Sequence, residues 1–204
     1  MTACKALVFD LGKVVFDLSF DRVFQAWATA SNAPYDALKS AFTFDALFDQ
    51  FERNEIAPAA FRAAVCARLG MTLTDPQFDA GWSALYLDVY PGVATLLARL
   101  ARRYRLVALI NTNALHARVW PAKYAAALRP FERVFCSHEL GARKPEARTY
   151  RPVLDYLQAA PHEVVFLDDS PDNVRGAESL GLTGIVVTSC AQMRAALRAL
   201  GVRE

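Results

Sequence analysis

The sequence predicts an α/β fold: a parallel sheet flanked by helices, with a helical insertion after its first strand. Short apolar runs alternate with longer amphipathic segments, and the runs are almost continuously apolar. This pattern is typical of strands buried on both faces of a sheet and joined by βαβ crossovers. The four clearest runs and a weaker fifth are ALVF at 6–9, LVALI at 106–110, VVFL at 164–167, GIVVT at 184–188 and RVFCS at 133–137.

The stretch 18–90 differs from the rest because it consists of amphipathic helical segments separated by Pro, Gly and Asn. We expect about four helices here, forming a cap domain over 18–90. The core domain then comprises 1–17 and 91–204. The four segments are FDRVFQAWATAS, YDALKSAFTFDALFDQFERNE, APAAFRAAVCARLG and DPQFDAGWSALYLDVY.

Pro91-Gly92 marks the return to the α/β core. VATLLARLARR follows it as the expected first crossover helix, and AQMRAALRAL near the end is the expected last surface helix.

Composition excludes several classes of function. A formal charge of +2, with basic residues scattered in ones and twos, argues against a nucleic-acid partner. No window reaches the roughly 18 apolar residues of a membrane span, and no signal-like segment opens the chain. We therefore expect a cytoplasmic protein without a membrane partner, either a monomer or a homodimer.

The cysteines indicate neither a zinc site nor a disulfide framework. They lie far apart and form no CxxC pair, so we expect buried small hydrophobes. They are Cys4, Cys66, Cys136 and Cys190.

Polar residues gather where the predicted strands end. Ligands of an open parallel sheet bind at the carboxyl ends of its strands, and Lys144 follows the weaker strand. Each residue also has an ordinary interpretation as a turn former, helix cap or solvated loop. Their joint placement at the ends of several strands favours a functional site over these ordinary interpretations. The other strand-end residues are Asp10 and Gly12, then Asn111, Thr112 and Asn113, then Asp168 and Asp169.

These residue types suit phosphoryl transfer. A carboxylate such as Asp10 can attack phosphorus, and the charges involved require a lysine and a hard cation. Mg²⁺ prefers oxygen ligands, which Asp10, a backbone carbonyl and Asp169 would provide. Lys144 would balance the phosphate charge, and Asn111 with the amides of 111–113 would hold phosphate oxygens.

The motifs resemble those of the haloacid dehalogenase superfamily, in its members with a helical cap after the first motif. VFDLGKVVFD, LINTN, ARKPEARTY and VFLDDSPDNVRGAESLG look like motifs I to IV, in order and at family-like separations. The DLG start, the NTN turn and the RKPEARTY segment are most similar to bacterial sugar-1-phosphate phosphatases of the YihX type. The phosphatase domain of soluble epoxide hydrolase looks like a more distant relative.

The resemblance implies roles for individual residues. Asp10 would be the nucleophile and a metal ligand, with the Gly12 carbonyl and Asp169 completing the metal site. Asp168 and Asn173 would support it from a second layer. The implied core is a parallel sheet of strand order 5-4-1-2-3, and the cap would recognise the leaving group. Candidate cap residues are Phe44, Phe48, Phe51 and Glu52.

Three residues depart from the pattern. Most phosphatases of this family carry a second Asp where this chain has Gly12, to assist the leaving oxygen. Motif II usually offers Ser or Thr where this chain has Ile110. Lys13 is unusual beside the nucleophile, and either adds a cation near the phosphate or points to solvent.

We therefore predict a Mg²⁺-dependent phosphatase of a small phosphorylated metabolite, such as a hexose 1-phosphate, acting through an aspartyl-phosphate on Asp10. One alternative is a 2-haloacid dehalogenase, which also uses an Asp nucleophile but lacks a metal and has a DxYGT start that is absent here. The other is a catalytically impaired protein that binds a phosphorylated ligand or a partner.

Overall fold

The computed structural model describes residues 4–204, and its centre is a five-stranded parallel sheet. The strands are β1 (Ala6–Phe9), β4 (Arg105–Ile110), β5 (Arg133–Cys136), β6 (Val164–Asp168) and β7 (Thr183–Val186). Their order is β5-β4-β1-β6-β7. Numbered along the chain within this sheet, that order is 5-4-1-2-3 read from the opposite edge. The predicted fold class is confirmed.

Helices cover both faces of this sheet. They are α6 (Val93–Leu100), α7 (Trp120–Lys123), α8 (Ala125–Leu128), α9 (Ser137–Leu140), α10 (Ala147–Leu157), α11 (Pro171–Glu178) and α12 (Cys190–Ala199). Short 3-10 helices span Ser83–Leu85, His116–Arg118 and Pro161–Glu163. Within residues 4–204, no helix combines the length and apolarity needed to cross a membrane.

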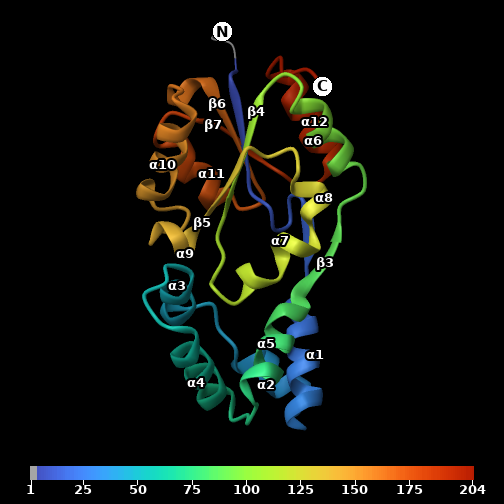
Figure 1. Ribbon diagram of the computed structural model, residues 1–204, viewed down its shortest axis with the longest axis vertical. Helices are drawn as coiled ribbons and strands as arrows, with labels where there is room; N and C mark the ends of the chain where they lie inside the picture. The colour runs from blue at the N-terminus through green and yellow to red at the C-terminus, as the bar shows by residue number, and fades with distance from the viewer. Residues whose placement is uncertain (1–3) are drawn as a thin grey trace.

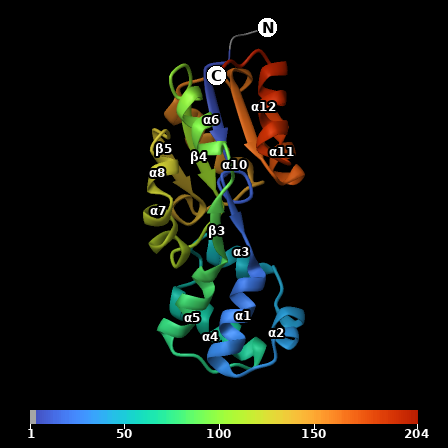
Figure 2. The same ribbon diagram turned by 90° about the vertical axis from the view of Figure 1, so that its right-hand side faces the viewer.

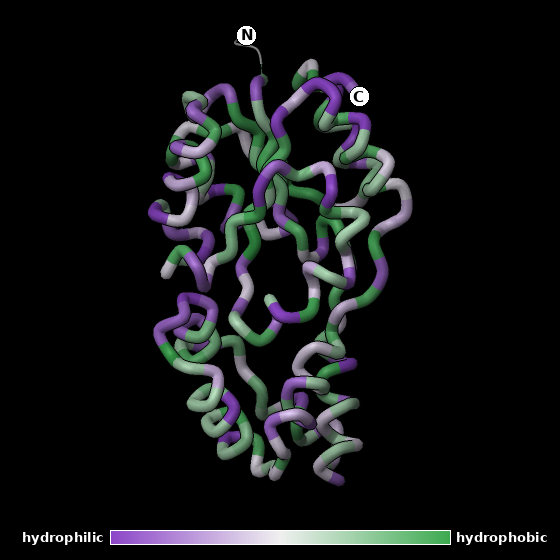
Figure 3. The backbone as a smooth tube through the Cα atoms, viewed as in Figure 1, coloured by the Kyte–Doolittle hydropathy of each residue, from purple (hydrophilic) through white to green (hydrophobic). Residues whose placement is uncertain are grey.

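The two faces of the sheet form separate hydrophobic clusters. Ala6 and Val8 of β1 pack with α10 and α11, whereas Leu7 and Phe9 pack with α6 and α12. This alternation within one strand explains its continuous apolarity, because both of its faces are covered. The strands accordingly form a hydrophobic centre in Figure 3. The core is a three-layer sandwich.

Five helices form a second lobe beyond the carboxyl ends of the core strands (Figures 1 and 2). They are α1 (Phe20–Ser31), α2 (Tyr35–Ala41), α3 (Ala46–Glu52), α4 (Pro58–Leu69) and α5 (Asp75–Trp82). The sequence predicted about four. The second expected segment is two helices, because Phe42 is extended and Asp45 starts α3 by accepting from the Leu47 N–H.

A two-stranded antiparallel ribbon joins the lobes, made of β2 (Phe16–Leu18) and β3 (Tyr86–Val89). The expected fourth helical segment thus ends as a strand. The side chains of Lys123 and Tyr124 donate to the carbonyls of Tyr86 and Leu87, at 2.5 and 2.6 Å. These contacts brace the ribbon against the core.

Aromatic rings fill the interior of the cap lobe. Trp27 stacks on Trp82, with ring centroids 5.6 Å apart, and its indole N–H donates to the Phe78 carbonyl at 3.0 Å. Gly81 lies directly against this stack, since a Cβ atom there would be 2.2 Å from Trp27 Cδ1. A side chain at residue 81 is therefore excluded by packing.

We predict that Gly81→Ala destabilises the protein although it improves helix propensity. Overpacking costs about 1–3 kcal/mol, whereas alanine gains at most about 1 kcal/mol over glycine in a helix. Urea unfolding should show a net loss. The control is Ala80→Gly at the exposed neighbouring position, which loses only helix propensity. A Gly81→Ala protein as stable as the parent would contradict this packing.

Candidate active site

Two carboxylates lie side by side at the carboxyl edge of the sheet. The register of β1 and β6 aligns Phe9 with Leu167, so Asp10 and Asp168, one residue further along each strand, are neighbours. Asp10 is 7% exposed and Asp168 is completely buried. Two neighbouring buried carboxylates can both stay ionised only beside a cation.

Lys144 provides that cation. Its Nζ lies 2.6 Å from Asp10 Oδ1 and 2.6 Å from Asp168 Oδ2, and the residue is 1% exposed. Burial alone would lower the pKa of Lys144, but the two carboxylates raise it, so the ammonium stays charged. Burial raises the pKa of Asp10 to about 7 against the opposing effect of Lys144.

Asp168 is held by further donors. Asn173 Nδ2 lies 3.0 and 3.1 Å from its two oxygens, and the Ser170 N–H donates to Oδ1 at 2.9 Å. Asp168 is thus saturated with hydrogen bonds. On Asp10, by contrast, Oδ2 accepts no hydrogen bond from residues 4–204.

The acidic cluster fits a hard divalent cation. Asp10, Asp168 and Asp169 each place a carboxylate oxygen within 4.8 Å of the others. Burial and the neighbouring Asp168 raise the pKa of Asp169. Within residues 4–204, the Gly12 carbonyl accepts no backbone hydrogen bond. Three carboxylates against one ammonium leave excess negative charge, and these oxygens are of the type that Mg²⁺ prefers.

Asn111 connects two of the predicted motifs. Its Oδ1 accepts the Lys144 N–H at 2.9 Å, and its Nδ2 donates to the Lys144 carbonyl at 3.0 Å. The side chain predicted to hold phosphate therefore holds the backbone of Lys144 instead. Asn111 still lines the crevice described below.

The structure does not bring the side chains of Thr112 and Asn113 into that crevice. The backbone N–H and carbonyl of Thr112 both bond to the Ser137 hydroxyl, at 2.9 and 2.7 Å. Asn113 is fully buried, and its Oδ1 accepts the N–H groups of Leu115 and His116. The Thr112 N–H, one of the amides predicted to hold phosphate, is therefore bonded to Ser137, and the Asn113 side chain stabilises the turn after β4.

His116 is a buried link between the core and the cap. Its Nε2 lies 3.0 Å from the Trp82 carbonyl, and its Nδ1 lies 3.0 Å from Asn113 Nδ2. A carbonyl only accepts, so Nε2 carries the proton and Nδ1 accepts. Burial lowers the pKa of His116 to about 4. The imidazole is neutral, and both of its nitrogens are occupied.

The cluster opens into a crevice of about 230 Å³ between the two lobes. This volume is below the roughly 300–1,000 Å³ of sites for drug-sized ligands, so a small molecule fits this conformation. The core contributes Asp10, Gly12, Asn111, Lys144, Asp169 and Asn173 to its walls, together with Ile110. The cap contributes Phe20, Phe48 and Glu52.

Two of the four candidate cap residues therefore face the crevice. Phe48 and Glu52 lie four residues apart on α3 and share one face of it. Phe51 instead stacks on Phe61 inside the cap, with centroids 4.0 Å apart, and Phe44 is 60% exposed.

A group of ion pairs beside the crevice was not predicted from the sequence. Arg143 Nε lies 2.8 Å from Glu52 Oε2, and Arg143 Nη1 lies 2.6 Å from Asp49 Oδ1. Arg53 and Glu146 form a second pair at 2.6 Å. These pairs join α3 to the loop that carries Lys144. The only sequence signal was the arginine directly before Lys144, which does not identify its partner.

Lys13 has its own partners at the edge of the crevice. Its Nζ lies 2.5 Å from both Asp17 Oδ1 and the Leu18 carbonyl, and its side chain is 46% exposed. The residue adopts a left-handed conformation, with φ of 60°. The ammonium is thus directed to the ribbon between the lobes.

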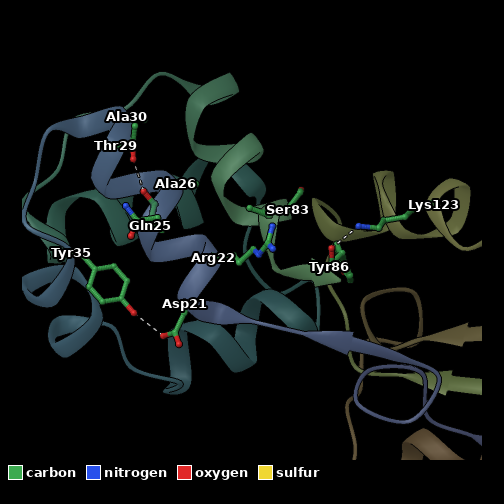
Figure 4. A pocket seen from close by; sticks show the side chains of 11 residues that line it. Asp21, Arg22, Gln25, Ala26, Thr29, Ala30, Tyr35, Ser83, Tyr86 and Lys123 are labelled. Atoms are coloured by element: carbon green, nitrogen blue, oxygen red, sulfur yellow. Dashed lines mark hydrogen bonds between the residues drawn. The ribbon is translucent and has the colours of Figure 1, made fainter. Parts of the chain in front are cut away.

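A larger groove of about 870 Å³ lies elsewhere, between α1 and α7 (Figure 4). Some of its polar side chains bond to each other or to backbone, as in Tyr35 to Asp21 at 2.9 Å and Lys123 to the Tyr86 carbonyl. None of the clustered acids lines it. Size alone therefore does not make it the reactive site.

Comparisons with known proteins agree with this geometry. A family model described as haloacid dehalogenase-like hydrolase matches residues 4–181. A D-ribitol-5-phosphate phosphatase of Bacteroides thetaiotaomicron is 23% identical over 183 residues, 87% of this chain and 88% of that protein. A phosphatase of Mycobacterium tuberculosis is 29% identical over 197 residues, 93% of this chain and 89% of that protein.

Among solved structures, a haloacid dehalogenase family enzyme of Bacteroides thetaiotaomicron, in complex with magnesium and inorganic phosphate, superimposes with a TM-score of 0.78. It is 27% identical, and the match covers 92% of this chain and 96% of that one.

We predict that His116 makes stability fall with acid. The unfolded histidine titrates near 6.5 and the folded one near 4, so the unfolded chain binds more protons between these values. The contribution is present above pH 6.5 and is lost as the pH falls toward 4, up to about 3 kcal/mol. Urea unfolding of His116→Gln across this range should show a shallower pH dependence than the parent.

The control for this measurement is His162→Gln, because His162 is exposed. Equal pH slopes for the parent and His116→Gln would contradict the assignment of a neutral buried imidazole.

Proposed function

This chain belongs to the haloacid dehalogenase-like hydrolase family, and on that premise we propose that it is a Mg²⁺-dependent phosphatase of a small phosphorylated metabolite. The proposed substrate is a sugar phosphate, such as a hexose 1-phosphate. One observation carries the proposal: buried Lys144 contacts both Asp10 and Asp168, with Asp169 beside them. The phosphatases among its relatives and the magnesium and phosphate complex support it.

Asp10 is the proposed nucleophile. One of its oxygens attacks phosphorus, the bond from phosphorus to the ester oxygen breaks, and the leaving oxygen takes up a proton as the alcohol departs. Water then attacks the aspartyl-phosphate, which releases inorganic phosphate and restores the carboxylate. Lys144 fixes Oδ1, so Oδ2 is the oxygen available for attack. The same ammonium offsets negative charge on the phosphate.

The proposed Mg²⁺ ligands are Asp10, Asp169 and the Gly12 carbonyl. Asp168 and Asn173 support them, since both belong to the hydrogen-bonded network around Lys144. When bound, the cation supplies positive charge that lets the anionic phosphate approach a carboxylate. Asp10 then stays ionised at neutral pH, because a neighbouring cation favours the charged form.

Phosphate contacts in this site come mainly from Lys144 and backbone amides. Ile110 has no donor, and the Asn111 side chain is bonded to the Lys144 backbone. The Asn111 N–H has no hydrogen-bond acceptor within residues 4–204, so it is the proposed backbone donor to the phosphate.

Gly12 affects which esters react well. A Cβ atom at residue 12 would lie 2.8 Å from Leu18 Cδ1, so an apolar side chain borders the place of the usual second acid. General acid assistance contributes about 10²–10⁴-fold. An ester with a better leaving group, such as an anomeric sugar oxygen, depends less on it, which favours a sugar 1-phosphate.

The alternatives fit the site less well. A 2-haloacid dehalogenase needs no metal, whereas the excess charge of three clustered acids suits a cation. A protein that only binds its ligand needs no nucleophile held against a buried lysine. The cytoplasmic location and the choice between monomer and homodimer stay predictions.

We predict that Asp10→Asn abolishes Mg²⁺-dependent phosphate release from a panel of sugar phosphates. Loss of a covalent nucleophile removes at least about 10³-fold in rate. The measurement is inorganic phosphate production, with exposed Asp36→Asn as the matched control. Turnover that survives in Asp10→Asn would rule out this nucleophile.

We predict that Asp169→Asn weakens Mg²⁺ binding, because the neutral amide is a poorer ligand than a carboxylate. Calorimetric titration with Mg²⁺ should give an affinity about 10–100-fold lower, the range reported for disturbed metal-site partners. Asp172→Asn, an exposed acid three residues away, is the control. Equal affinity in the parent and Asp169→Asn would remove Asp169 from the metal site.

A further inference from the structure

One carboxylate in the crevice has no part in the proposed chemistry. Glu52 ends α3 of the cap, is 5% exposed, and lines the crevice with Asp10 and Lys144. It is the only carboxylate on the described wall apart from Asp10 and Asp169. Glutamate is rarely this buried unless it is paired, so its partners indicate its use.

Arg143 satisfies only half of this carboxylate. Its Nε donates to Glu52 Oε2 at 2.8 Å, and its Nη1 pairs with Asp49. Within residues 4–204 no donor reaches Glu52 Oε1. Burial raises the pKa of Glu52 despite the opposing Arg143 guanidinium, and the 2.8 Å ion pair with that guanidinium holds the carboxylate in place. The result is a fixed carboxylate with one oxygen available to a ligand.

The position of Glu52 places it against the leaving group. The phosphate end of a substrate lies at Asp10 and Lys144, in the core wall. The remainder of the ester would then face the cap side of the crevice, where Phe20, Phe48 and Glu52 are joined by Leu85 and Tyr86. An ionised carboxylate accepts hydrogen bonds and donates none. It therefore suits hydroxyl groups and repels a second anionic group.

We propose that Glu52 determines specificity by accepting a hydrogen bond from a leaving-group hydroxyl through Oε1. The substrate class is then phosphomonoesters of neutral polyhydroxy alcohols, meaning polyols and sugars, rather than esters whose alcohol carries a carboxylate or a second phosphate. The aromatic Phe48 beside it packs against the carbon skeleton. This inference rests on the proposed phosphatase function.

Glu52→Gln tests the charge and the strength of this acceptor. Kinetics with Mg²⁺ use three probes: D-ribitol 5-phosphate, which is neutral and polyhydroxylated, 3-phosphoglycerate, which carries a carboxylate, and p-nitrophenyl phosphate, which has no hydroxyl. We expect kcat/KM for ribitol 5-phosphate to fall about 10-fold, mainly through KM. Activity on 3-phosphoglycerate should rise, and that on p-nitrophenyl phosphate should stay within about threefold.

The matched control is Glu55→Gln, the same substitution at an exposed position three residues further on. It should leave all three substrates unchanged. Glu52→Asp is a second variant, which keeps the charge but withdraws it by one methylene. It should lose activity on ribitol 5-phosphate while still rejecting 3-phosphoglycerate. Equal losses on ribitol 5-phosphate and p-nitrophenyl phosphate in Glu52→Gln would overturn the proposal. An unchanged ratio of kcat/KM for ribitol 5-phosphate to that for 3-phosphoglycerate would overturn it as well.

A binding measurement separates this inference from the phosphatase assignment. Ribitol 5-phosphate and inorganic phosphate are titrated into Asp10→Asn and into Asp10→Asn with Glu52→Gln, both with Mg²⁺. We expect the second substitution to weaken only ribitol 5-phosphate, about 10-fold. Equal binding in the two proteins would overturn the role of Glu52. Failure of the parent to hydrolyse any probe would overturn the phosphatase function instead.

Discussion

The rest of the site depends on one buried ammonium. Lys144 lies between Asp10 and Asp168, 2.6 Å from each, where an unpaired lysine would be strongly destabilising. The parallel register of β1 and β6 puts the two acids side by side, and the lysine reaches them from the loop after β5. The strand register and the charge of Lys144 therefore depend on each other. The two acids cannot both ionise without the buried ammonium, and the ammonium cannot stay charged and buried without the two acids.

The loop that carries Lys144 is held from both lobes. On the core side, Asn111 bonds both the N–H and the carbonyl of Lys144. On the cap side, Arg143 reaches the acidic end of α3. Consecutive residues of one loop thus contact α3 of the cap and the clustered acids of the core. The ion pairs of α3 and the backbone of Lys144 are therefore separated by a single peptide unit.

Much of the fold could be predicted from the sequence, because strands buried on both faces leave continuous apolar runs and parallel topology aligns their ends. The gathering of Asp10, Lys144 and Asp168 followed from this. The roles of the turn after β4 could not be predicted. The side chains of Asn111 and Asn113 both accept hydrogen bonds from backbone N–H groups, and this depends on the local geometry of the turn rather than on residue type. The pairing of Arg143 with Glu52 was equally hidden, because it joins segments of different lobes.

Two of the departures from the usual motifs, Gly12 and Ile110, affect the polarity of the same crevice. Gly12 puts apolar Leu18 beside the position of the usual second acid, and Ile110 puts an apolar side chain in the crevice where motif II usually has a hydroxyl. Both changes make the crevice less polar around the reacting bond, which strengthens the remaining interactions of Lys144 and the acids. In the proposed reaction the proton for the departing alkoxide then comes from water. Under the proposed function, such a site favours substrates whose leaving oxygen stabilises negative charge, and selectivity depends on the opposite wall, where Glu52 is the cap carboxylate that lines the crevice.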